Sequence, residues 1–194
     1  MNPAITLPDA PPVRRRRGRL QLILILAVVI APMILASAMY QWRFWVPETR
    51  SYHGELIGNG QSRADLGIAD AVETRWQLLV TVPQACDSAC KELVFLARQI
   101  HIGLNRDVSR ASHALAVAQP LTADYDAQLQ REYPQLTRYQ LELDAYGKTA
   151  GPDSGAQLWI VDPHGNLVLR YDATSKGKAI LNDLRHLLKI SQIG

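Results

Sequence analysis

The sequence is short of cysteine, and one long stretch of it has no charge. Its 194 residues include only two cysteines, Cys86 and Cys90, so any thiol chemistry must be carried by this single pair. No charged residue occurs from Leu20 to Trp42. No Ser-His-Asp arrangement, phosphate-binding loop or paired-carboxylate motif stands out from chance, which argues against a serine hydrolase and a nucleotide-binding enzyme.

The body of the chain also lacks an excess of basic residues. The net charge is +3, but five of the 21 basic residues are arginines at positions 14–17 and 19. Beyond residue 19 there are 16 basic and 17 acidic residues, a net charge of −1. A nucleic-acid-binding domain needs a basic surface, so we predict no nucleic-acid partner.

The uncharged stretch predicts a transmembrane anchor over residues 20–42. At ~1.5 Å per residue it is long enough to cross a bilayer as a helix, and a proline such as Pro32 is tolerated there. Five arginines precede it and only Arg43 follows it closely. The positive-inside rule then predicts a cytoplasmic N-terminus and a body in the periplasm, as a single-pass protein of a bacterial inner membrane.

A cleaved signal peptide is the alternative for this stretch. Arginines, an apolar run and Ala36-Ser37-Ala38 resemble the three regions of such a peptide. The run is longer than the ~7–15 residues usual for a signal peptide, and Trp42, Phe44 and Trp45 follow it where an interfacial aromatic belt would lie. We favour the uncleaved anchor, and both alternatives export residues from about 46 onward.

Four segments are expected along the chain. Residues 1–19 are predicted to be a disordered basic tail, since residues 1–13 contain four prolines and no apolar periodicity. The anchor at 20–42 comes next. Residues 43–75 are predicted to be a polar linker with a short strand around 54–57, and residues 76–194 to be the folded domain.

Apolar periodicity within 76–194 predicts alternating strands and helices. Strands are expected at 77–82, 113–118 and 140–143, and a β-hairpin at 157–161 and 166–171 around the turn Asp162-Pro163-His164-Gly165. Helices are expected from the cysteine pair to Leu104, over 122–133, and from about 175 to the end. This order predicts an α/β fold, a thioredoxin-like central mixed sheet with flanking helices, preceded by one transmembrane helix.

Several of these motifs together resemble the Sco/SenC family over roughly residues 74–190. They are the run RWQLLV at 75–80, Cys86-x-x-x-Cys90, Glu92-Leu93, and Trp159-Ile160-Val161-Asp162-Pro163-x-Gly165. That family consists of membrane-anchored, thioredoxin-like proteins that help to assemble the copper centre of cytochrome c oxidase. The resemblance implies copper on Cys86 and Cys90, and a cytochrome c oxidase subunit or other assembly factors as partners.

The sequence departs from this family at the expected copper site. The family usually has proline directly after each cysteine, where this chain has Asp87 and Lys91. It also has a histidine ligand before the hairpin, and that position falls here on Ser154. No histidine occurs between His113 and His164. Asp153 and His164 are left as substitute ligands that the sequence does not rank.

The thiol pair has three roles open to it. Two thiolates at positions i and i+4 of a helix start can face the same way, and soft thiolates select Cu(I). If Cys86 lies just outside the regular helix, the pair can instead form a disulfide and act in thiol–disulfide exchange. A purely structural disulfide is the third role. We therefore name Cys86 and Cys90 as the candidate catalytic and metal-ligating residues.

The sequence alone is compatible with two functions from different classes. The first is a Sco-like factor for oxidase copper-centre assembly, acting by Cu(I) handling or by thiol–disulfide exchange; a metallochaperone or assembly factor is favoured, and a thiol–disulfide oxidoreductase is left open. The second is a non-catalytic accessory protein of the respiratory oxidase, with a structural disulfide. The tryptophans Trp76 and Trp159 are expected to pack in the core. Four histidines are expected to be structural or exposed: His53, His101, His113 and His186.

Overall fold

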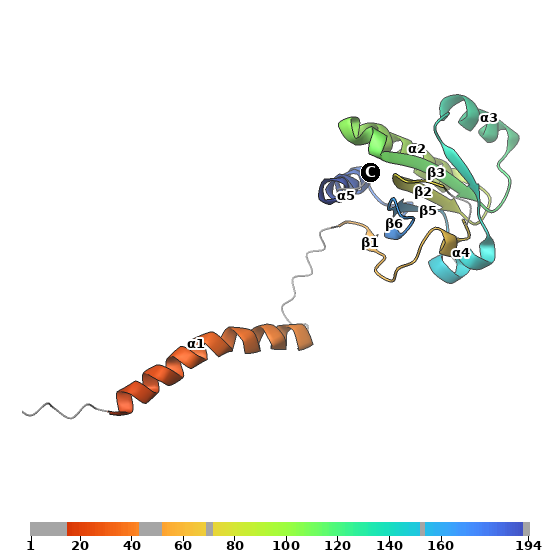
Figure 1. Ribbon diagram of the computed structural model, residues 1–194. Helices are drawn as coiled ribbons and strands as arrows, with labels where there is room; N and C mark the ends of the chain where they lie inside the picture. The colour runs from red at the N-terminus through yellow and green to blue at the C-terminus, as the bar shows by residue number, and fades with distance from the viewer. Residues whose placement is uncertain (1–14, 43–51, 69–71, 152–153, 192–194) are drawn as a thin grey trace, which may run out of the picture. The chain divides into compact units, whose positions relative to one another are not determined.

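The computed structural model describes residues 15–42, 52–68, 72–151 and 154–191 (Figure 1). The predicted disorder of residues 1–13 and the candidate ligand Asp153 lie outside these residues. The chain forms two units, residues 1–49 and 50–194. Each unit is described by itself below.

The first unit consists of one long helix. Helix α1 (Arg15–Trp42) continues through Pro32, and its 22-residue segment Gly18–Met39 has a mean hydropathy of 2.8 with no residue buried. This segment spans about 33 Å, enough to cross the hydrocarbon core of a bilayer. Residues 15–19 were predicted to belong to the disordered tail, but they form the first turns of this helix.

The second unit is built on a six-stranded mixed sheet of order β1-β6-β5-β2-β3-β4. Three neighbouring strands are parallel: β2 (Trp76–Val82), β3 (Ala111–Val117) and β4 (Thr137–Gln140). The other three are antiparallel to their neighbours: β5 (Gln157–Val161), β6 (Leu167–Asp172) and β1 (Glu55–Leu56). The predicted central mixed sheet is confirmed, and the short strand expected around residue 55 is β1.

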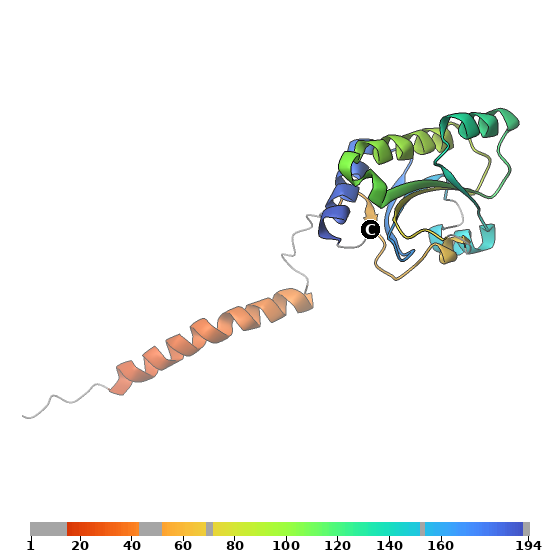
Figure 2. The same cartoon turned by 45° about the horizontal axis from the view of Figure 1, so that its top comes forward.

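Helices cover both faces of this sheet (Figures 1 and 2). One face carries α2 (Ser88–Gly103), α3 (Ala123–Glu132) and α5 (Gly177–Ile190). The other face carries α4 (Leu143–Ala150) and the 3-10 helix η1 (Ala64–Leu66). A second 3-10 helix, η2 (Asn105–Arg110), leads from α2 into β3.

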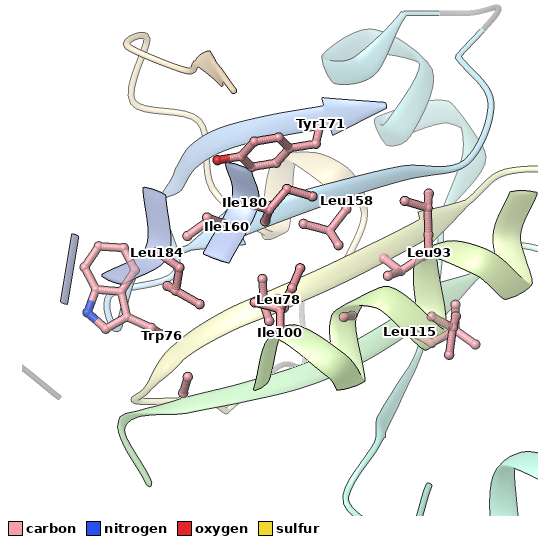
Figure 3. Close-up of a cluster of buried hydrophobic side chains, with 14 of the residues drawn as sticks. Trp76, Leu78, Leu93, Ile100, Leu115, Leu158, Ile160, Tyr171, Ile180 and Leu184 are labelled. Atoms are coloured by element: carbon pink, nitrogen blue, oxygen red, sulfur yellow. The ribbon is translucent and has the colours of Figure 1, made fainter. Parts of the chain in front are cut away.

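The larger core lies between the sheet and helices α2 and α5. All seven residues of β2 are buried, as expected for a central strand covered on both faces. Leu93, Ile100, Ile180 and Leu184 of the two helices meet the strands there (Figure 3). Each of these fully buried aliphatic side chains contributes roughly 1.5–3 kcal/mol to the stability of the fold.

The smaller core lies on the opposite face and includes residues from the predicted linker. Leu66 and Ile68 are 0% and 3% exposed and pack with Trp159 and Tyr146. Part of the 43–75 segment is therefore an integral part of the folded unit, because two of its apolar side chains complete the cover of the sheet.

Between β3 and β5 the structure differs from the prediction in two ways: one strand is shifted, and one helix was not predicted. The strand expected at 140–143 is β4 and ends at Gln140, and helix α4 was not expected. The helix forms because the Glu142 carboxylate accepts hydrogen bonds from the amides of Asp144 and Ala145 at 3.1 Å, which caps its first turn. The hairpin is confirmed, and Gly165 takes the positive φ of 89° that its turn requires.

Candidate functional site

The cysteine pair lies where β2 passes into α2. Strand β2 ends at Val82, and α2 begins at Ser88 with Asp87 as its extended N-cap residue. The Asp87 carboxylate accepts a hydrogen bond from the amide of Cys90 at 3.0 Å. This cap satisfies one of the free amides of the first turn. The cap therefore fixes where the helix starts, with Cys86 just before it and Cys90 inside its first turn.

Cys86 and Cys90 form a disulfide, with their Cα atoms 5.2 Å apart. That separation is within the usual range for disulfides. Cys90 is 0% exposed and belongs to the larger core, whereas Cys86 is half-buried at the edge of that core. Solvent therefore reaches the bond from the Cys86 side.

The two residues that follow the cysteines, Asp87 and Lys91, both have structural partners. Asp87 is the N-cap of α2, as described above. The Lys91 amide donates to the Asp87 carbonyl oxygen at 3.1 Å, and the Lys91 ammonium lies 5.0 Å from the centroid of the Tyr125 ring. Burial raises the pKa of Tyr125 to about 12, so the ring that faces this ammonium is a neutral phenol at neutral pH.

Strand register gives the end of the sheet at which Ser154, the position expected for the family's histidine, lies. Gln157 at the start of β5 pairs with Thr81 at the end of β2, so Ser154 lies at the same end of the sheet as the cysteines. The Ser154 hydroxyl donates to the carbonyl oxygen of Ala150. A hydroxyl is a poor ligand for soft Cu(I), so this position does not replace the nitrogen of a histidine.

His164 is excluded as a ligand by the same register. It follows β5, whose last residue Val161 pairs with Gln77 near the start of β2. The length of β2, about 20 Å at ~3.3 Å per residue, therefore separates His164 from the cysteines. Among the described residues, no group of three or more His, Cys, Asp or Glu side chains is arranged to hold a metal. Among the residues that the structure describes at this end of the sheet, the only soft donors are the two sulfurs, when they are reduced.

A buried hydrogen-bonded chain supports the end of β2 from the opposite face of the sheet. Trp159 Nε1 donates to Thr81 Oγ1 at 2.9 Å, and Thr81 Oγ1 donates to the Tyr146 hydroxyl at 3.2 Å. The Tyr146 hydroxyl reaches the Gly155 carbonyl oxygen at 3.3 Å. Trp159 was predicted to lie in the core, but its hydrogen bonds were not predicted, because the chain of bonds depends on the unexpected helix α4. The chain ties α4 and the start of β5 to the strand that leads into the disulfide.

The histidines expected to be scattered are brought into defined contacts. The rings of His101 and His113 lie 4.9 Å apart, and both residues are buried. His53 Nδ1 lies 2.8 Å from the Asp183 carboxylate, which also accepts a hydrogen bond from the Tyr171 hydroxyl at 2.8 Å. None of these groups lies at the disulfide, so the cysteine pair has no histidine beside it in the described part of the chain.

The described parts of the chain thus combine an apolar helix long enough to cross a membrane with a thioredoxin-like sheet that carries a disulfide at the first turn of α2. Family models match both parts of the chain. A transmembrane-like, thioredoxin-like C-terminal domain matches residues 76–191, and a transmembrane-like N-terminal domain matches residues 11–43. The chain belongs to this family of transmembrane-like proteins with a thioredoxin-like C-terminal domain. No curated protein matches the sequence.

Solved structures with a similar fold include Sco proteins and thiol–disulfide oxidoreductases. Yeast Sco1 with copper bound is 12% identical, with a TM-score of 0.49 over 62% of this chain and 82% of that chain. Arabidopsis thaliana ScoI with copper bound is 10% identical, with a TM-score of 0.45 over 59% and 87%. The thioredoxin domain of a Bacteroides vulgatus thiol-disulfide oxidoreductase is 11% identical, with a TM-score of 0.46 over 60% and 81%. At these identities the similarity is one of fold.

Proposed function

We propose that this chain is a membrane-anchored, Sco-like protein that acts by thiol–disulfide exchange through Cys86 and Cys90. Its role is to assist the assembly of the copper centre of cytochrome c oxidase, from the periplasmic side of a bacterial inner membrane. The observation that carries the proposal is the disulfide itself, with one sulfur half-buried at the surface and the other in the core. The arginine-rich N-terminal side of α1 supports the orientation.

The exchange proceeds in two balanced steps. A thiolate of the partner attacks the Cys86 sulfur, a mixed disulfide forms, and the electron pair of the broken S–S bond leaves on Cys90 as a thiolate. A second thiolate of the partner then attacks its own sulfur in the mixed disulfide and releases Cys86 as a thiolate. The partner is oxidised by two electrons and this chain is reduced by two. The reverse sequence reduces a partner's disulfide, as copper loading of a cysteine site would need.

Two features of the site act on the Cys90 thiolate in opposite directions. Its position in the first turn of α2 favours the thiolate through the helix dipole and the free amides. The Asp87 carboxylate, bonded to the Cys90 amide, disfavours a second negative charge. Because these two effects oppose each other, the Cys90 thiolate is not strongly stabilised, and the disulfide is not expected to be strongly oxidising. This supports a role in which the cysteine pair acts in its reduced form.

In the reduced form the two sulfurs suit Cu(I) as a cargo. Two thiolates are enough for a linear Cu(I) site, whereas a stable Cu(II) site needs a nitrogen donor. The register removes His164 from consideration, and Ser154 supplies only a hydroxyl. We therefore expect the reduced protein to hold Cu(I) and to bind Cu(II) weakly.

The second candidate function is a non-catalytic accessory protein of the oxidase, in which the disulfide is structural. The complete burial of Cys90 favours it, as does the loss of both prolines and of the histidine ligand. The bond closes a loop with a sequence separation of only 4, and such a loop contributes about 2 kcal/mol in the chain-entropy description. In this case the oxidase would need the folded domain but not its two thiols.

The experiment that separates the two functions compares three strains. One carries Cys86→Ser with Cys90→Ser, one carries Ser88→Ala on the same turn as a matched control, and one lacks residues 50–194. Thiol exchange or Cu(I) handling predicts that the double change lowers the copper content and activity of the oxidase as far as the deletion does. An accessory role predicts normal oxidase in the double variant and loss only in the deletion. Normal oxidase in all three strains would reject both functions.

A further inference from the structure

A cluster of arginines stands at the N-terminal start of the membrane-length helix α1. The cluster consists of Arg14, Arg15, Arg16, Arg17 and Arg19, and we refer to these five residues as the arginine cluster. The sequence contains no acidic residue from position 10 to position 47. The charge of the cluster therefore has no carboxylate near it in the sequence that could balance it.

Most of the arginine cluster belongs to α1 and not to the disordered tail that was expected. Helix α1 begins at Arg15 and continues without a break into the apolar segment (Figure 1). Each residue advances the helix axis by ~1.5 Å, so four of the five arginines are held at fixed heights along that axis. A disordered tail would fix no such height.

The length of the apolar segment determines how deep these arginines lie in a bilayer. Leu20–Met39 is about 30 Å long at ~1.5 Å per residue, which equals the thickness of the hydrocarbon core. With Leu20 at the edge of the core, the backbone of Arg19 lies about 1.5 Å beyond that edge and that of Arg15 about 7.5 Å beyond it. The headgroup layer is roughly 5–8 Å thick on each side. A spanning α1 therefore holds the four arginines at the depth of the lipid phosphates.

The arginine positions are spread around the helix and do not share one face. Successive residues of an α-helix turn by about 100°, so positions 15, 16, 17 and 19 cover more than half of the circumference of α1. A single peptide meets one face of a helix only. Lipids surround a membrane helix and can contact all four positions at once.

The residue type within the cluster favours phosphate as the anion. All five cations are arginines, and the first lysine of the chain is Lys91. A guanidinium can bind a phosphate through two parallel hydrogen bonds, whereas an ammonium acts as a point charge. Lipid headgroups present phosphates at this depth. In phosphatidylglycerol no headgroup ammonium neutralises the phosphate charge, so an anionic lipid of this kind fits the cluster better than a zwitterionic one.

We propose that the arginine cluster binds the phosphates of anionic lipids in the leaflet on the N-terminal side of α1. A cluster of ~4–8 basic residues next to a transmembrane helix is typical of such binding, and each arginine near the surface raises the affinity about fivefold. Free phosphate and nucleic acid carry the same charge, but neither is confined to the depth at which α1 holds the arginines.

The test uses the full chain in detergent micelles and native mass spectrometry, which counts the lipids bound to each chain. The probes are dioleoyl phosphatidylglycerol and dioleoyl phosphatidylcholine, which have the same acyl chains and differ in headgroup charge. Phosphatidylglycerol should bind at least about tenfold more tightly, and this preference should decrease as the salt concentration rises. Equal binding of the two lipids would overturn the proposal.

Three variants locate the lipid site. The first combines Arg15→Gln, Arg16→Gln, Arg17→Gln and Arg19→Gln; glutamine is also a good helix former, so α1 should persist while the preference for phosphatidylglycerol is lost. The second has lysine at the same four positions and should keep the preference with an affinity a few-fold lower, because the bidentate pairs are lost. The control is Arg106→Gln, an exposed arginine of the folded unit, and should bind lipid as the wild type does.

Retention of the preference by the glutamine chain, or its complete loss in the lysine chain, would contradict a site based on the arginine charges. Two competitors separate lipid from other sources of phosphate. Displacement of phosphatidylglycerol by an equal concentration of sodium phosphate, or tighter binding of a single-stranded RNA, would also overturn the proposal. The Cys86→Ser, Cys90→Ser chain should bind lipid as the wild type does, so this result is independent of the thiol function.

Discussion

The buried His113 makes a specific prediction about stability and pH. Its ordinary pKa of 6.5 falls to about 4 in the folded chain, chiefly because burial disfavours the charged imidazole. The unfolded chain therefore binds a proton between these two pH values where the folded chain does not. The resulting stability is fully present above pH 6.5 and is lost as the pH falls from 6.5 to about 4.

The magnitude of this loss follows from the two pKa values. At about 1.4 kcal/mol per pKa unit, the complete titration lowers the free energy of unfolding by about 3 kcal/mol. Between pH 7.0 and pH 4.5 the expected loss is about 2 kcal/mol, since His113 is only partly protonated at pH 4.5. Carboxylates and the other histidines add their own pH dependence, so the contribution of His113 is obtained as a difference from a variant.

The variant is His113→Leu in residues 50–194, which form a separate compact unit. Urea unfolding of wild type and variant is compared at pH 7.0 and pH 4.5, in buffers free of carboxylate and sulfate. The wild type should lose about 2 kcal/mol more than the variant on acidification. His186→Gln, an exposed histidine on α5, is the control and should behave as the wild type. Equal losses in wild type and His113→Leu would refute the assignment of a buried, neutral imidazole.

Two further predictions concern backbone positions. Asp87→Ala removes the acceptor for the Cys90 amide and should lower the free energy of unfolding by about 1 kcal/mol, measured by urea denaturation with the disulfide intact. An unchanged stability would show that the cap contributes nothing. Gly67→Ala should destabilise the fold by more than about 1 kcal/mol, because φ is 80° and the new Cβ would lie 2.7 Å from the backbone oxygen of Glu142. Gly58→Ala meets no atom within 4 Å and is its control, so equal thermal midpoints for the two alanine variants would contradict the predicted clash.

Much of the fold could be predicted because its main elements bury their apolar residues in regular patterns. The continuous run of β2 and the helical spacing of Leu93, Ala97 and Ile100 in α2 both correspond to buried faces. Helix α4 escaped prediction because it is only 8 residues long. The alternation of Tyr139, Leu141 and Leu143, which runs into its first residue, is typical of a strand.

The candidate site was also predicted only in part. Chain spacing alone identifies Cys86 and Cys90, but the complete burial of Cys90 and the half-burial of Cys86 depend on where Asp87 starts the helix. The contact between His101 and His113 depends on how α2 packs on β3, which spacing does not reveal. One signal was present, since His113 alternates with Ala111 and Leu115 and so falls on the same face of its strand as these two core residues.

The central claim is that Cys86 is the sulfur through which this chain exchanges disulfides with a partner. The most direct test expresses the full chain with Cys90→Ser or with Cys86→Ser, and isolates mixed disulfides after acid quenching. The account predicts that the Cys90→Ser chain is trapped through Cys86 in a mixed disulfide with a component of the oxidase assembly. The Cys86→Ser chain should give none, because Cys90 is 0% exposed. The absence of any mixed disulfide in the Cys90→Ser chain, or equal trapping through Cys90, would contradict the claim.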